Sequence, residues 1–229
     1  MTLAVDSVAY NSVASGNTSF TVTPVGTLDA VIAKVSMDST SGNVITAITY
    51  GGVAMTFVDS FNATAEAQTT FADYILNNPS SGAQTLAVTY SDTSNDRTVA
   101  AIGFTTAGGA DVEHVSTEKN NTYTTSGSSE PRGSISLTGE TCYVSMSFVS
   151  GRSSTNGVTQ LTNWKDRGES DIGQITGVYD YDILSTTDVT TGLSQSNSDQ
   201  VVWMATAYKE GVVDSSIIPQ IMHHRRQMQ

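Results

Sequence analysis

Cysteine, histidine and charged residues are scarce in this chain of 229 residues. It holds one Cys and three His, and only 14% of its residues are charged. A single thiol excludes an intrachain disulfide, and three His leave little material for a zinc site or a Ser-His-Asp triad. The alternating sequence around Cys142 predicts a strand with a buried, inert thiol. At this length a full core forms without disulfides or metals.

Basic residues are also few. Ten Lys and Arg stand against 22 Asp and Glu, which gives a net charge of −12 and a pI near 4.3. This balance disfavours binding to nucleic-acid phosphates and to anionic membranes, and no apolar run approaches the roughly 18 residues of a transmembrane helix. Residues 1–6 lack the basic and apolar regions of a secretory signal. We therefore expect synthesis in a host cytoplasm without a signal peptide, which fits a virion released by lysis.

Apolar and hydroxyl side chains alternate with a period of two over most of the chain, which predicts strands. Residues 29–37 are apolar at both parities, so we expect a strand buried on both faces. Gly51-Gly52 between two strand-like runs predicts a hairpin, and residues 77–82 predict a turn. About ten strands are expected, typical of an all-β, antiparallel, jelly-roll-like β-sandwich. The expected strands cover residues 19–25, 29–37, 45–50, 54–58, 70–76, 84–90, 97–105, 134–137, 142–149, 175–184 and 201–208.

The domain organisation read from the sequence is one sandwich domain, residues 1–211, followed by a C-terminal interaction arm, residues 212–229. No repeat of 20–50 residues is found, and residues 116–132 predict a long exposed loop. The tail is apolar first and basic last, so it either binds another subunit or an edge of a sheet, or adds a strand to the same domain. The residues expected at an assembly contact are Ile217, Ile218, Ile221, Met222, Arg225 and Arg226.

Candidate catalytic groups are sparse. No Gly-x-Ser-x-Gly elbow or phosphate loop is present, and His114 is expected on a strand edge or loop. Asp180 and Asp182 share one face of a predicted strand and could form a carboxylate pair for glycoside hydrolysis, or bind Ca²⁺. The simpler interpretation is a solvated strand face opposite buried Tyr179 and Tyr181. We expect no enzymatic activity, no cofactor and no metal.

The two tryptophans differ in their neighbours. Trp203 lies in an apolar run and is expected in the core. Trp164 has polar neighbours, so it either covers one end of the sandwich or stacks on a sugar or a subunit. Together with Tyr179, Asp180 and Asp182, it forms the candidate ligand-binding set, with a surface glycan as the expected ligand.

Three segments resemble a broad group of β-sandwich proteins encoded by tailed phages and environmental bacteria. Residues 48–56, ITYGGVAMT, are similar to their "YGG-V-x-L-T" hairpin. Residues 71–82, FADYILNNPSSG, are similar to their strand followed by an "NPPSG" turn, and residues 84–91 to the next strand. Members are commonly described as virion structural, capsid-decoration, head-fibre or tail-associated proteins. The resemblance extends over residues 8–210, implies a jelly-roll-like sandwich in a virion, and supplies no catalytic residues.

These observations lead to one main hypothesis and two alternatives. We expect a phage virion surface protein, a capsid decoration or head-fibre protein, that binds capsid or tail proteins of the same virion and forms homo-oligomers. The first alternative is a carbohydrate-binding adhesin or receptor-binding tail module. The second is a glycoside-cleaving tail enzyme.

Overall fold

A computed structural model describes residues 3–38, 45–63, 69–91, 96–120, 132–150, 158–172, 174–181, 184–195 and 201–212. Within these residues the chain is all-β, with every paired strand antiparallel, which confirms the predicted fold class. There are seventeen strands in this part of the chain rather than about ten. It contains no helix that is long and apolar enough to cross a membrane.

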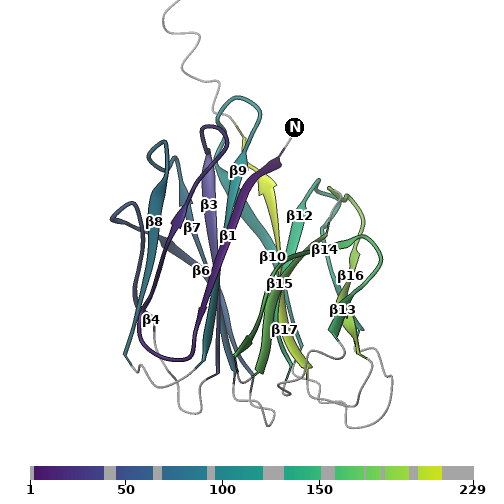
Figure 1. The fold of residues 1–229 in the computed structure, drawn as a ribbon. Coiled ribbons are helices and arrows are strands. Elements are labelled where there is room, and N and C mark those ends of the chain that lie inside the picture. The colour runs from purple at the N-terminus through teal and green to yellow at the C-terminus, as the bar shows by residue number, and fades with distance from the viewer. Residues whose placement is uncertain are drawn as a thin grey trace, which may run out of the picture.

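The first half of the chain forms one sandwich of two sheets (Figure 1). A five-stranded sheet has the order β1-β9-β3-β7-β6, and a four-stranded sheet has the order β2-β8-β4-β5. The strands are β1 (Ala4–Val13), β2 (Thr18–Val22), β3 (Ala30–Asp38), β4 (Ile45–Tyr50), β5 (Val53–Ala54), β6 (Thr56–Ala63), β7 (Thr69–Asn77), β8 (Gln84–Tyr90) and β9 (Arg97–Thr105).

The second half forms another sandwich with the same plan. Its five-stranded sheet has the order β10-β17-β12-β15-β14, and its three-stranded sheet has the order β11-β16-β13. The strands are β10 (Val112–Asn120), β11 (Arg132–Ile135), β12 (Tyr143–Ser150), β13 (Val158–Gln160), β14 (Trp164–Ile172), β15 (Gln174–Tyr181), β16 (Val189–Gln195) and β17 (Val201–Glu210).

The two sandwiches are topological copies of each other. Matching β1 to β10, β2 to β11, β3 to β12, β4 to β13 and β6–β9 to β14–β17 reproduces both strand orders, and only β5 has no counterpart. The strand registers agree as well. Asp73 of β7 pairs with Lys34 of β3, and at the equivalent place in the second half Asp180 of β15 pairs with Ser145 of β12. A Tyr follows the Asp in both halves. The fold is therefore an internal duplication with a repeat of about half the chain.

The two five-stranded sheets face each other in the middle of the molecule, with the small sheets outside (Figure 1). Strand β1 contacts β14 and β6 contacts β10, while β9 contacts β15 and β7 contacts β17. When each strand is replaced by its counterpart in the other half, the β1–β14 contact becomes the β10–β6 contact, and the β9–β15 contact becomes the β17–β7 contact. Strand β3 contacts its own counterpart, β12. The halves thus pack like two subunits of a two-fold dimer joined in one chain.

This stacking explains which strands are apolar on both faces. In β3, Val31, Ala33, Val35 and Met37 point into the core of the first sandwich, and Ala30 and Ile32 point toward the second half. The prediction that residues 29–37 are buried on both faces is confirmed. The outer cores of the two sandwiches are apolar, and the second contains Trp203 with no exposed side-chain area, as expected.

Two turns also lie where the sequence predicted them. Gly51 and Gly52 have φ angles of 59° and 81° and connect β4 to β5, and Gly82 has a φ of 80° in the turn before β8. Glycine adopts positive φ without steric cost, so these turns form at low cost. The hairpin and turn predictions are confirmed.

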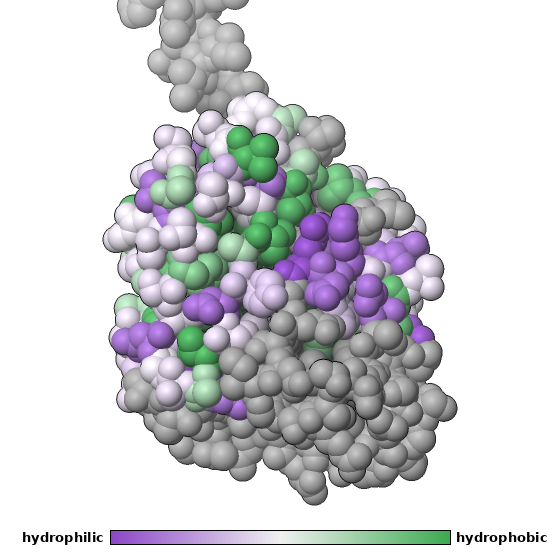
Figure 2. All heavy atoms as spheres, viewed as in Figure 1, coloured by the Kyte–Doolittle hydropathy of each residue, from purple (hydrophilic) through white to green (hydrophobic). Residues whose placement is uncertain are grey.

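The prediction of a loop over residues 116–132 is wrong for residues 116–120, which belong to β10, and for Arg132, which begins β11. Strand β10 lies at the edge of its sheet and pairs only with β17, so one of its backbone sides and much of its side-chain surface meet solvent. Its polar composition is that of an edge strand, which natural proteins keep charged to avoid edge pairing. Edge strand β14 follows the same rule, and Figure 2 shows hydrophilic side chains gathered where β14 lies in Figure 1. Residues 121–131 lie outside the described part of the chain.

Candidate functional site

Between the two five-stranded sheets, a polar band separates two apolar clusters. One cluster contains Ile32, Ile102 and Phe104, and the other contains Phe71, Val202 and Met204. The buried polar side chains of the band are Lys34, Ser36, Asp73, Ser145, Ser147, Asp180 and Thr206. Because burial of a charge is costly unless it is paired, this band needs internal partners.

Lys34 and Asp73 supply the central ion pair. They lie opposite each other on β3 and β7, with Lys34 Nζ 2.5 Å from Asp73 Oδ2 and no exposed area on either side chain. Thr206 Oγ1 and Tyr208 Oη of β17 donate to the same carboxylate oxygen at 2.6 and 2.9 Å, and Lys34 also donates to Thr206 at 2.7 Å. The carboxylate of the first half is thus held by hydroxyls of the second.

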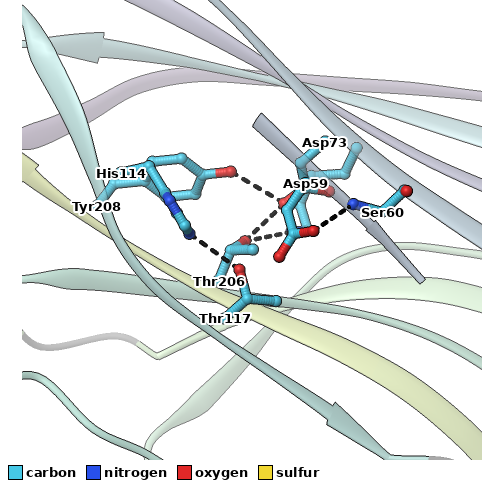
Figure 3. A network of polar contacts seen from close by, with 8 residues as sticks. Asp59, Ser60, Asp73, His114, Thr117, Thr206 and Tyr208 are labelled. Carbon is cyan, nitrogen blue, oxygen red and sulfur yellow. Dashed lines mark hydrogen bonds and ion pairs between the residues drawn. The ribbon is translucent and has the colours of Figure 1, made fainter. Parts of the chain in front are cut away.

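Figure 3 shows how this centre continues toward the surface between β6 and β10. Asp59 accepts hydrogen bonds from the Ser60 amide at 2.7 Å and from Lys119 at 2.8 Å. Burial alone raises the pKa of the Asp59 carboxyl, but bonds from Lys119, Thr117 and the Ser60 amide outweigh it and lower the pKa. These contacts join the two halves at the edge, where both charges are about one third exposed.

Asp180, the counterpart of Asp73, is buried as well. It has no exposed side-chain area, and its Oδ2 accepts a hydrogen bond from Arg167 Nε of the neighbouring strand β14. Burial raises the pKa of this carboxyl, and Tyr143 and Arg167 offset only part of the rise. The interpretation of Asp180 as part of a solvated strand face is therefore wrong, because the second five-stranded sheet has a sheet on both sides.

Four buried oxygen atoms of the band have no hydrogen-bond partner within the protein. They are Asp73 Oδ1, Asp180 Oδ1, Ser145 Oγ and Ser147 Oγ. Buried polar atoms without protein partners are typical positions for internal water molecules. The carboxylates of the band, Asp73 and Asp180, have no exposed side-chain area, so the band is a buried feature of the interface between the sheets.

Cys142 and His114 carry the other candidate reactive groups. Cys142 has no exposed area, and burial raises the pKa of its thiol to about 11. The prediction of a buried thiol is confirmed, although Cys142 forms an isolated bridge with Ser185 just before β12 instead of lying within the strand. His114 lies on edge strand β10, as expected, and its Nε2 is 2.9 Å from Thr117 Oγ1.

A groove of about 570 Å³ lies at one end of the second sandwich, where the β13–β14 connection meets the start of β16. Its lining combines amide, hydroxyl and charged side chains with two aromatic rings. The lining residues are Arg132, Gln160, Leu161, Thr162, Asn163, Trp164, Tyr181, Asp188, Val189 and Thr190. Ligand sites in proteins typically measure roughly 300–1,000 Å³, so this groove has the size of a binding site.

Of the three residues of the sequence-derived ligand set that the structure describes, Trp164 alone lines this groove. It begins β14 rather than lying in a loop, it is 5% exposed, and its Nε1 donates to the Thr190 carbonyl at 3.1 Å. Tyr179 and Asp180 have no exposed area, so their place in a surface ligand set is wrong. Asp182 lies outside the described residues, as do the six tail residues assigned to an assembly contact, Ile217, Ile218, Ile221, Met222, Arg225 and Arg226.

Sequence reasoning missed the polar members of the groove. Tyr181, expected to be buried, is half-buried and meets Trp164 edge-on, with ring centroids 5.7 Å apart and planes at 69°. Gln160, Thr162 and Asn163 occur in a short polar segment that carries no motif, so only the structure brings them beside Thr190. Glu118 was missed as well, and it accepts a hydrogen bond from the buried Trp203 indole at 2.7 Å.

In the part of the chain that the structure describes, no three His, Cys, Asp or Glu side chains gather in a way that could hold a metal ion. Two features of the described residues are therefore candidates for a functional role. They are the interface between the two sandwiches, with its buried ion pairs, and the groove at Trp164. Comparison of the chain with protein-family models, with curated proteins and with solved structures finds no match.

Proposed function

We propose that this chain is a structural protein on the surface of a bacteriophage particle, a capsid decoration or head-fibre protein that acts by binding. Two similar sandwiches are joined face to face, and the charges between them are paired internally. This construction is the observation that carries the proposal, because a body whose buried charges are paired internally suits attachment better than turnover. The resemblance of residues 48–56, 71–82 and 84–91 to virion sandwich proteins supports the same role.

The outward surface fits a particle part that meets solvent. The small sheet of the first sandwich presents exposed hydroxyl side chains at Ser19, Thr21, Thr85 and Thr89. With a net charge of −12, neighbouring copies repel one another unless a specific contact forms, which keeps the unassembled protein soluble. Capsid or tail proteins of the same virion are the proposed partners, and a homo-oligomer follows the symmetry of a particle.

A direct test measures the protein in purified particles. Particles from the source culture are banded on a density gradient, and the chain is quantified against the major capsid protein by mass spectrometry. The proposal predicts copurification at a fixed ratio and antibody labelling of the particle surface. Recovery only in the soluble fraction contradicts it.

The arm formed by residues 212–229 is proposed as the assembly contact. A chain that ends at Gly211 is compared with the full chain for occupancy on particles that lack the protein. Reduced occupancy, with an unchanged far-UV circular dichroism spectrum, is the expected result. Equal occupancy of the two chains contradicts the arm, though not the virion role.

Carbohydrate recognition is a second candidate function, in the manner of an adhesin or a receptor-binding tail module. The groove at Trp164 favours it, since amide and hydroxyl side chains there surround an aromatic pair. A surface protein of a phage can serve both roles, because attachment uses other faces of the molecule.

A further inference from the structure

The duplicated fold allows the groove to be compared with the same place in the first sandwich. There, Gly51 and Gly52 turn the chain back into β5, which pairs with β4 as a fourth strand of the small sheet. The Gly51 amide donates to the carbonyl of Thr85, the second residue of β8, at 2.9 Å. The hairpin therefore covers the beginning of β8.

The second sandwich lacks this hairpin. Strand β13 ends at Gln160 and β14 begins at Trp164, so three residues replace the hairpin and no strand corresponds to β5. Thr190 is the second residue of β16, the counterpart of β8, and its carbonyl accepts the Trp164 indole N–H at 3.1 Å. The Trp164 indole thus contacts the beginning of β16, and the groove of about 570 Å³ lies beside this contact.

The aromatic pair at this position occurs in both halves but differs in its surroundings. Phe57 and Tyr74 meet edge-on in the first half, with centroids 5.6 Å apart, as Trp164 and Tyr181 do at 5.7 Å in the second. Phe57 is 53% exposed, whereas Trp164 is 5% exposed and is fixed by its bond to Thr190. The second pair is therefore a rigid wall of the groove, and the half-buried ring of Tyr181 remains accessible there.

The chemistry of the lining selects a class of ligand. Gln160, Thr162, Asn163 and Thr190 are exposed, and amides and hydroxyls both donate and accept hydrogen bonds, as sugar hydroxyls do. Arg132 and Asp188 contribute opposite charges, so the groove favours neither anions nor cations. An aromatic ring beside such groups packs against the apolar face of a sugar ring.

We propose that this groove binds a neutral oligosaccharide, with the amide and hydroxyl side chains of the β13–β14 connection and Thr190 bonding its hydroxyls and Tyr181 packing on its ring. The site lies in the half of the fold that has no counterpart of β5 among the described residues. The inference rests on the carbohydrate-recognition role and not on the virion role, so either can fail without the other.

The test uses the full chain, biotinylated and displayed on streptavidin so that weak sites add by multivalency, on an array of neutral and anionic glycans. The groove variant combines Gln160→Ala with Asn163→Gly. Asn163 has a φ of 71°, and glycine keeps that turn without strain while it removes the amide. Loss of two hydrogen bonds weakens binding of a hit, measured by calorimetry, by about tenfold or more.

Tyr181→Ala tests the aromatic ring of the groove, and Tyr74→Ala, at the equivalent position of the first half, is its control. Both remove the same ring from equivalent positions, and far-UV circular dichroism establishes that each variant folds. The inference predicts binding of a neutral oligosaccharide that is weakened by the groove variant and Tyr181→Ala and retained by Tyr74→Ala. No glycan bound, anionic glycans alone, or equal binding by the groove variant would each overturn it. Self-association of the native chain that the groove variant abolishes would also overturn it, since a second copy would then be the occupant.

Discussion

Replacement of Lys34 by methionine removes the ammonium group that lies 2.5 Å from Asp73 in the centre of the molecule. The carboxylate stays buried with only the hydroxyls of Thr206 and Tyr208 as donors, and its Oδ1 has no protein partner. Breaking a buried ion pair on one side costs roughly 3–5 kcal/mol. This is a large part of the roughly 5–15 kcal/mol by which domains are stable.

Urea denaturation measures this loss with two probes. Both tryptophans, Trp164 and Trp203, lie in the second sandwich, whereas Lys34 and Asp73 lie in the first, and far-UV circular dichroism reports on all strands. For m-values near 2 kcal/mol per molar urea, the midpoint falls by about 2 M. Because hydroxyls of β17 hold Asp73, the tryptophan transition is expected to move together with the circular dichroism transition.

The double variant Lys34→Met, Asp73→Asn separates pairing from packing. It keeps an acceptor for Thr206 and Tyr208 but buries no charge at this place, so most of the loss should be recovered, to within about 1–2 kcal/mol of the native chain. The reasoning is refuted if Lys34→Met alone costs less than about 1 kcal/mol. It is also refuted if the tryptophan transition stays in place, which would mean that the halves unfold independently.

Two further predictions concern titratable groups of the second half. Because burial raises the pKa of Asp180, the folded protein holds its proton to higher pH than the unfolded chain, so this residue lowers the free energy of unfolding as pH rises from the ordinary Asp pKa to the raised one. Asp180→Asn should remove that downward component at pH values above the ordinary Asp pKa, and equal pH slopes for variant and native chain argue against the burial described. Cys142, with its thiol pKa raised to about 11, should resist iodoacetamide in the native protein and react once urea unfolds it. Native-state labelling, followed by mass spectrometry, at the rate of a free thiol contradicts its burial.

Local features of the fold could be predicted because they follow local rules. The alternation in residues 84–90 and 97–105 matches β8 and β9, and the Gly51-Gly52 turn follows from the positive φ that glycine tolerates. Edge strand β10 was not predicted over its full length because many of its side chains are polar and face solvent. A polar sequence of this kind is also typical of a loop.

The duplication and the site could not be predicted for a different reason. The two halves share the pattern of strands, but few identical residues mark the equivalence, and the Asp-Tyr pair at Asp73 and Asp180 is too short to identify a repeat. Charges such as Lys34 and Asp180 are buried because two sheets meet, which no local pattern encodes. The residues that line the groove come from β11, the β13–β14 connection, β15 and the start of β16, which lie apart in the sequence, so no local motif marks the site.

We propose that this duplicated sandwich is a part of a phage particle and acts there by binding. Cryo-electron microscopy of gradient-purified particles from the source culture tests it most directly. The account predicts surface density at symmetry-related positions into which the four stacked sheets fit as one body. Particles whose surface density is fully explained by other proteins, with this chain absent from their protein content, would contradict it.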